Sequence, residues 1–104
     1  MQVLKLADDL FGPLREGNKL TTIRKGRREV FLGALRFDGA EDESLTEVVN
    51  VTSVTFTTLG GVAKEVLWGD GFEDHDDALE QMKRFYPDIT LSTEVTVIDF
   101  ADIE

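Results

Sequence analysis

The alternation of apolar and polar residues along this chain predicts a mixture of short strands and short helices. Five segments rich in β-branched and aromatic residues are expected to be strands: residues 2–6, 20–24, 30–37, 45–58 and 93–100. Three segments have the spacing of helices: residues 8–16, 62–68 and 75–86. The order of strand, helix, three strands, two helices and strand does not form βαβ units. It favours an α+β fold, a small β-barrel with short helices packed at its ends.

Individual residues indicate where some of these elements begin, bend or break. We expect the first helix to break near Gly12, because Pro13 cannot lie deep inside a helix. Asp74 is a suitable N-cap for the last helix. The apolar face of the long strand at 45–58 changes parity near Asn50, as expected for a strand that bends around a barrel.

The composition is that of one small domain. A chain of 104 residues with 41% hydrophobic residues can bury a core, and it has no length for a second domain. We therefore expect a single domain over residues 1–104. The apolar runs are far shorter than the roughly 20 residues that cross a membrane, and the acidic N-terminal segment does not resemble a signal peptide. Without cysteine there is neither a disulfide framework nor a thiolate site, so we expect a cytoplasmic protein.

The charge of the chain is distributed unevenly. The formal net charge is −10, yet residues 1–36 hold eight of the eleven lysines and arginines and only four of the acidic residues, for a net charge of +4. The remaining 68 residues therefore carry −14. Such a chain should repel polyanions except at one basic face, where a phosphate could still be attracted. An acidic surface with an incidental basic loop is the other interpretation.

The segment 17–24 is the first candidate site. It places a lysine, a threonine and an arginine within a few residues of a glycine turn. Thr22 and Arg24 share one face of the expected strand, and Lys19 joins them only if it lies on the turn before that strand. A buried Lys19 could act as a base, and Thr22 as a nucleophile or hydrogen-bond donor. The alternative is an amphipathic strand with solvated polar residues.

The acidic segment 70–77 is the second candidate site. Its spacing does not fit an EF-hand, which needs glycine and glutamate at positions that His75 and Gln81 occupy here. We therefore expect no metal ion. Asp70 lies between two glycines, which would let its carboxylate approach a ligand closely as a general base, although an ordinary turn aspartate is the commoner case.

A basic cluster and a few aromatic residues form the third candidate. Phosphate contact is one role for the cations, and a solvated loop is the other; the aromatic residues could stack on a base or belong to the core. The residues in question are Arg24, Lys25, Arg27 and Arg28 for the cations, and Trp68, Phe72 and Tyr86 for the aromatic side chains.

Taken together, these segments resemble an ASCH domain, a member of the PUA-like superfamily of small β-barrels. The resemblance rests on three motifs: Gly17-x-Lys19-x-x-Thr22-x-Arg24, then Asp70-Gly71-Phe72, and then Ala78-Leu79-x-x-Met82-x-x-Phe85-Tyr86-Pro87. The family resemblance implies an open barrel with a cleft that faces RNA or a nucleoside. Some bacterial members are amidohydrolases that act on N4-acetylcytidine. We expect no cofactor.

The resemblance also implies roles for particular residues. The family's catalytic lysine, threonine and glutamate fall on Lys19, Thr22 and Asp70, so the carboxylate here is one methylene shorter. In addition, Arg28-Glu29 stands where the family has a Gly-Asp pair.

Several functions follow from these observations as hypotheses. The first is an enzyme that hydrolyses an acylated nucleoside, with Thr22 at the carbonyl, Lys19 and Asp70 moving protons and Arg24 on the oxyanion. The second is a non-catalytic reader of single-stranded RNA or a modified base. A ribonuclease using the same cleft and a protein-interaction module are further alternatives. We expect a monomer.

Overall fold

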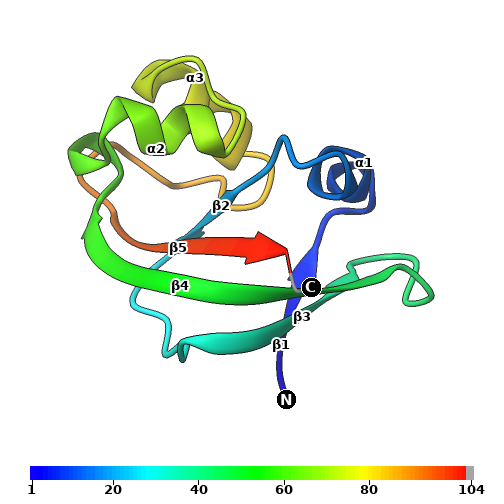
Figure 1. Cartoon of the computed structure of the whole chain (residues 1–104). Coiled ribbons are helices and arrows are strands. Elements are labelled where there is room, and N and C mark those ends of the chain that lie inside the picture. Colours follow the sequence, from blue (N-terminus) through cyan, green and yellow to red (C-terminus); the bar gives the residue numbers. More distant parts are fainter. Residues whose placement is uncertain (103–104) are drawn as a thin grey trace.

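The computed structural model describes residues 1–102, which form one curved sheet with short helices packed against it (Figure 1). The strands are β1 (Gln2–Leu6), β2 (Thr21–Lys25), β3 (Gly33–Gly39), β4 (Thr46–Thr58) and β5 (Glu94–Asp102). The helices are α1 (Phe11–Arg15), α2 (Lys64–Gly69) and α3 (His75–Met82), with 3-10 turns η1 (Asp8–Leu10) and η2 (Leu59–Gly61). This order is the one predicted from the sequence. No helix in the part of the chain described is long and apolar enough to cross a membrane.

The sheet is half of a barrel. Its strand order is β1-β3-β4-β5-β2; β1 and β3 are parallel, and all other neighbours are antiparallel. The sheet is strongly curved, with α2 and α3 near one end and α1 near the other (Figure 1). The predicted α+β class and barrel-like curvature are confirmed. Because β1 and β2 stand at the two edges of the sheet, a seam remains between them.

A bulge in β4 produces part of this curvature. The register between β4 and β5 shifts after the pair Val51–Phe100, because Ser53 pairs with Asp99 and Thr52 is the extra residue. A bulge of this kind bends its strand and reverses which side chains face the core. This confirms the parity change that the sequence places near Asn50.

The core consists of two apolar clusters on opposite sides of β5. Val97 and Ile98 are neighbours on β5 and point to opposite faces, so each belongs to a different cluster. The cluster beneath α1 contains Leu6, Phe11, Leu14, Leu35, Phe37, Val49, Val51, Ile98 and Phe100. The cluster beneath α2 and α3 contains Ile23, Leu59, Val62, Leu67, Ala78, Met82, Ile89, Val95 and Val97. Both clusters therefore hold helices against the sheet.

Most element boundaries differ from the sequence prediction by one or two residues, and two differ by more. Strand β3 begins at Gly33, because the side chain of Gln2 bonds to the backbone N–H and C=O of Phe31 in place of a strand partner. Helix α3 ends at Met82, because the N–H groups of Phe85 and Tyr86 both bond to the carbonyl of Met82 in a tight turn. The last aromatic residues therefore leave the helix axis.

The first helix does break, at a slightly earlier position than Gly12. The 3-10 turn η1 ends at Leu10 and α1 begins at Phe11. Pro13 is the third residue of α1, where a backbone N–H has no partner within the helix, so the missing N–H costs nothing there.

Candidate functional site

Lys19 is placed by the end of α1. Gly17 has a φ of +77°, and its N–H bonds to the carbonyl of Leu14 at 3.2 Å. The N–H of Asn18 bonds to the carbonyl of Pro13 at 3.0 Å. This is a Schellman cap, in which a glycine in the left-handed region closes the helix. Lys19 therefore lies in the turn before β2, the position it needs to join Thr22 and Arg24.

Asp70 is placed by the same kind of cap at the end of α2. Gly71 has a φ of +88°, and its N–H bonds to the carbonyl of Trp68 at 3.0 Å. The N–H of Phe72 bonds to the carbonyl of Leu67 at 2.9 Å. Asp70 is the last residue before the left-handed glycine, so its side chain is fixed by the local turn.

The two caps are joined by the backbone. The N–H of Leu20 bonds to the carbonyl of Gly69 at 2.8 Å. A Cβ atom on Gly69 would lie only 3.3 Å from Thr21 Oγ1, so a glycine allows this close approach. As a result, the residues next to this bond, Lys19 and Asp70, meet although they are far apart in the sequence.

Lys19 and Asp70 form a buried ion pair. Lys19 Nζ contacts Asp70 Oδ1 directly and donates a hydrogen bond to the carbonyl of Thr21 at 2.8 Å. The two side chains are 5% and 6% exposed, and the shorter carboxylate of aspartate reaches the amine. Burial lowers the pKa of Lys19, opposed by the charge of Asp70. Burial likewise raises the pKa of Asp70, opposed by Lys19. A proton can therefore move between the two groups without a change in net charge.

Thr22 and Arg24 stand beside this pair on β2. Both face the cavity described below, as the alternation of a strand requires. Arg24 Nε donates to Thr22 Oγ1 at 3.1 Å, and Arg24 Nη1 donates to the carbonyl of Lys5 on β1 at 2.7 Å. Thr21 points the other way and donates to Asp99 at 2.8 Å.

A cavity of about 200 Å³ opens at the seam of the half-barrel. Its floor carries the Lys19–Asp70 pair, and its walls are mostly apolar. The lining residues come from β1 and η1 (Lys5, Leu6, Ala7, Leu10), from β2 and the turn before it (Lys19, Thr22, Ile23, Arg24), from the 40–45 loop (Ala40), and from α2, α3 and their ends (Asp70, Phe72, Met82, Phe85, Tyr86). Lys19, Thr22 and Asp70 thus face one shared cavity.

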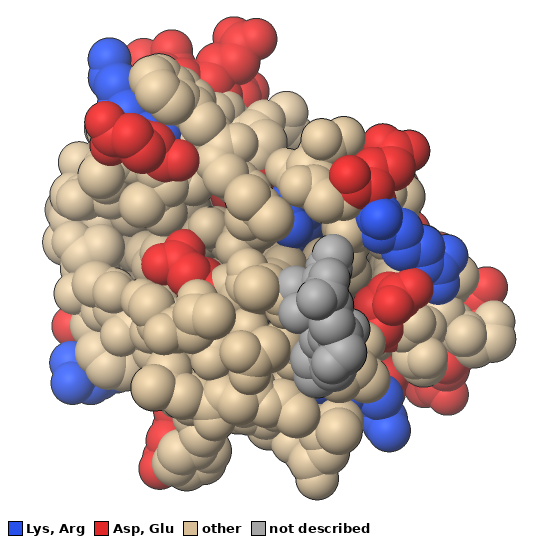
Figure 2. All heavy atoms as spheres, in the orientation of Figure 1, with Lys and Arg blue, Asp and Glu red and all other residues tan. Residues whose placement is uncertain are grey.

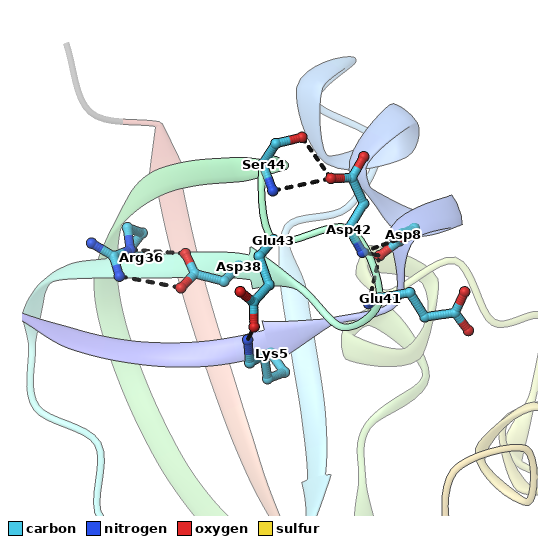
Figure 3. A network of polar contacts seen from close by, with 8 residues as sticks. All are labelled: Lys5, Asp8, Arg36, Asp38, Glu41, Asp42, Glu43 and Ser44. Atoms are coloured by element: carbon cyan, nitrogen blue, oxygen red, sulfur yellow. Dashed lines mark hydrogen bonds and ion pairs between the residues drawn. The ribbon is translucent and has the colours of Figure 1, made fainter.

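Polar contacts fix two parts of the cavity rim. The Asp8 carboxylate accepts hydrogen bonds from the N–H groups of Glu41 and Asp42, which holds the 40–45 loop against η1 (Figure 3). On the other side, Arg84 forms two hydrogen bonds with Asp9, at 2.9 and 3.1 Å. This second contact ties η1 to the segment after α3.

Comparison with solved structures identifies the architecture. An ASCH domain from Lactobacillus crispatus JV V101 matches 95% of this chain and 78% of its own length, with a TM-score of 0.69 and 14% sequence identity. This chain has the ASCH fold. A mutant ASCH protein from Zymomonas mobilis matches 96% of this chain and 66% of its own, with a TM-score of 0.66 and 11% identity. A protein from Enterococcus faecalis V583 matches 95% of this chain and 77% of its own length, with a TM-score of 0.64 and 13% identity.

The similarity lies in the backbone. Neither a protein-family model nor a curated protein sequence matches this chain.

Three of the cations expected to bind substrate lie outside the cavity of this ASCH fold. Lys25 Nζ is 3.8 Å from a carboxylate oxygen of Asp88. The guanidinium of Arg27 lies 4.0 Å from the centre of the Phe56 ring, and Arg28 Nε bonds to the carbonyl of Lys25. Of the basic cluster, only Arg24 lines the cavity.

The aromatic residues also divide into two groups. Phe72 and Tyr86 line the cavity, whereas Trp68 is 57% exposed and its indole N–H donates to the carbonyl of Glu73. Phe85 lines the cavity and is missing from the sequence-based set. A signal for it exists, because Phe85 stands next to Tyr86 in the third motif of the family resemblance.

The acidic segment after Asp70 has structural contacts. The Asp74 side chain caps α3 by accepting from the N–H of Asp77 at 2.8 Å, as predicted. His75 Nε2 lies 2.6 Å from the carbonyl oxygen of Val62. Among residues 1–102, no group of three or more acidic, histidine or cysteine side chains is arranged to hold a metal ion.

Proposed function

We propose that this ASCH-fold domain binds a nucleoside in its cavity and hydrolyses an amide bond on that nucleoside, with N4-acetylcytidine as the substrate to test. The observation that supports the proposal most strongly is the buried Lys19–Asp70 pair, which opens onto the same cavity as the Thr22 hydroxyl. A buried amine and carboxylate cost several kcal/mol of solvation each, and such perturbed groups in a cleft are typical of catalytic sites.

The cavity suits a single base or nucleoside. Its volume of about 200 Å³ lies below the ~300–1,000 Å³ typical of pockets for drug-sized ligands. Phe72, Phe85 and Tyr86 offer aromatic faces on which a base can stack. The polar groups gather at the floor, so a ligand that enters base-first brings its exocyclic substituent to Thr22.

The proposed reaction gives Lys19, Asp70 and Thr22 each a role. A proton passes from Lys19 Nζ to Asp70, which leaves the amine neutral. As Thr22 Oγ1 attacks the acetyl carbonyl, the amine takes the hydroxyl proton. The resulting ammonium then protonates the exocyclic nitrogen, the C–N bond breaks, and cytidine leaves. Water then hydrolyses the acetyl-threonine ester: its hydroxyl joins the acetyl group as acetic acid, and its proton restores the Thr22 hydroxyl. The proton held by Asp70 passes back to Lys19 Nζ, which restores the ion pair. A positioned base of this kind contributes about 10²–10⁴-fold to the rate.

The experiment is a turnover assay with purified protein and N4-acetylcytidine, in which released cytidine is separated by chromatography. We expect Lys19→Met, Thr22→Val and Asp70→Asn each to lower kcat by about 100-fold or more. Lys25→Met is the matched control, since Lys25 lies at the end of the same strand but outside the cavity. Cytidine release by the wild type no faster than by Lys19→Met would refute the proposal.

A non-catalytic reader of a modified base or of single-stranded RNA is the second candidate. The aromatic lining favours it, because stacking binds a base without any chemistry. Calorimetric binding of N4-acetylcytidine without release of cytidine is the result that favours the reader over the enzyme. Cleavage of end-labelled RNA would instead indicate a ribonuclease.

A further inference from the structure

The Thr22 hydroxyl is held by a single side chain. Thr22 is 4% exposed, and its Oγ1 accepts a hydrogen bond from Arg24 Nε. A threonine side chain has three staggered χ1 positions, and more than one of them is common in strands. A charge-assisted hydrogen bond to Oγ1 favours the position in which the hydroxyl oxygen faces the guanidinium. The orientation of the proposed nucleophile therefore depends on Arg24.

Arg24 is itself fixed from the opposite edge of the sheet. Its Nη1 donates to the carbonyl of Lys5, which belongs to β1, whereas Arg24 belongs to β2. The strand order puts β1 and β2 at the two edges, so this guanidinium bridges the seam of the half-barrel. Arginine makes the two contacts from two different nitrogens of a rigid, planar fork, whereas lysine would have to make both from one nitrogen.

We propose that Arg24 is a positioning residue: its guanidinium, anchored across the seam on the Lys5 carbonyl, holds the Thr22 hydroxyl in the orientation for attack. This inference rests on the proposed function, and it differs from the oxyanion role expected from the sequence. Two of the three guanidinium nitrogens are bonded to protein oxygens and not directed at a ligand carbonyl. A misplacement of about 1 Å can cost on the order of 100-fold in rate, so control of one rotamer matters for catalysis.

The kinetic test compares Arg24→Gln and Arg24→Lys with the wild type on N4-acetylcytidine. Both variants are expected to lower kcat by about 10- to 100-fold and to change KM by less than about threefold, because the substrate is still bound but the nucleophile is misoriented. In a Thr22→Val background, Arg24→Gln should produce no further loss. Arg27→Gln is the matched control, because Arg27 lies outside the cavity. A rise in KM with kcat unchanged, or losses that add in the double variant, would overturn the proposal.

A second measurement does not depend on turnover. Three-bond couplings to the Thr22 methyl group report χ1 directly by NMR. The wild type is expected to show one χ1 position, and Arg24→Gln to show averaging over at least two. Arg24→Lys keeps the charge and the buried methylenes, and it should show the same averaging. If Thr22 keeps one χ1 position in both variants, Arg24 does not position it. Should N4-acetylcytidine prove not to be a substrate, this experiment still decides the role of Arg24.

Discussion

At the residue scale, the most unusual feature is the burial of two opposite charges on the floor of a cavity. Moving charged groups out of water costs several kcal/mol each, and their attraction repays this only with good geometry. Apolar side chains of similar size would fill the same place at lower cost. A chain that keeps Lys19 and Asp70 there gives up stability, which is typical of residues needed for chemistry.

This cost can be measured with a double-mutant cycle. Lys19→Met or Asp70→Leu alone leaves one charge buried without its partner, and we expect each to lower the free energy of unfolding by about 3–5 kcal/mol. The double variant should be as stable as the wild type or more stable by about 1–4 kcal/mol, while losing activity. Urea denaturation followed by circular dichroism gives the four free energies. A double variant less stable than either single one contradicts this account.

Sequence reasoning reaches the site residues but not all their contacts. The strand period puts Thr22 and Arg24 on one face, and the glycine turn frees Lys19 from the parity of that strand. The hydrogen bond from Arg24 to Lys5 could not be predicted from the sequence, because it joins two edge strands whose proximity depends on the curvature of the whole sheet. The sequence also does not predict which cations of the basic cluster lie outside the cavity, because their partners Asp88 and Phe56 approach them only in the folded chain.

At the element scale, the site depends on how two short helices end. Each helix stops in a Schellman cap with a glycine in the left-handed region, and each cap delivers one member of the ion pair. The sequence predicts the first glycine as a helix end. It does not predict where α3 ends, because the spacing of its apolar residues continues to Tyr86 while the backbone turns at Met82.

The cap of α2 makes a specific prediction. Gly71→Ala places a Cβ in open space, so its cost is backbone strain alone, about 1–2 kcal/mol of unfolding free energy. Because Asp70 shifts with the cap, we expect turnover to fall by at least about tenfold at temperatures where the variant is fully folded.

Gly12→Ala is the control for that substitution. Gly12 lies in α1, a Cβ there meets no atom within 4 Å apart from its chain neighbours, and its φ is outside the left-handed range. The gain usual for Gly→Ala in a helix is offset by the ring of Pro13, which disfavours a Cβ on the helical residue before it, so we expect the free energy of unfolding to change by less than about 1 kcal/mol and turnover to stay unchanged. Thermal denaturation of both variants gives their stability, and the cytidine assay gives their turnover. Equal activity in Gly71→Ala and the wild type would show that the cap does not position Asp70.

At the scale of the whole molecule, the charge distribution favours a small neutral ligand over a polyanion. The net charge is −10, and in the view of Figure 2 the lysine and arginine side chains are scattered singly and form no patch. Two cations near the seam of the sheet are already paired with acidic groups of the protein, Lys5 with Glu43 and Arg84 with Asp9. On this face, the uneven charge along the sequence does not gather into a basic groove.

Salt dependence tests this argument. We expect the Kd for cytidine to change by less than about twofold between ~50 and ~200 mM salt, because a nucleoside carries no phosphate and is uncharged at neutral pH. The affinity of a protein that contacts 6–10 phosphates of an RNA would fall by about 10³- to 10⁵-fold over the same range of salt concentration. Calorimetry with cytidine and with a short single-stranded RNA distinguishes the two. Tight RNA binding that weakens steeply with salt would favour the reader.

The two glycine caps have a consequence for how this architecture tolerates change in length. Each cap is formed by residues close to it in the sequence, and one backbone hydrogen bond, from Leu20 to Gly69, holds the two caps side by side. Chain added in the loops between β2 and β3 or between β3 and β4 leaves that local geometry intact. Proteins of this shape can therefore grow by loop insertion without disturbing the reacting groups, in keeping with solved neighbours of which this chain spans only 66–78%.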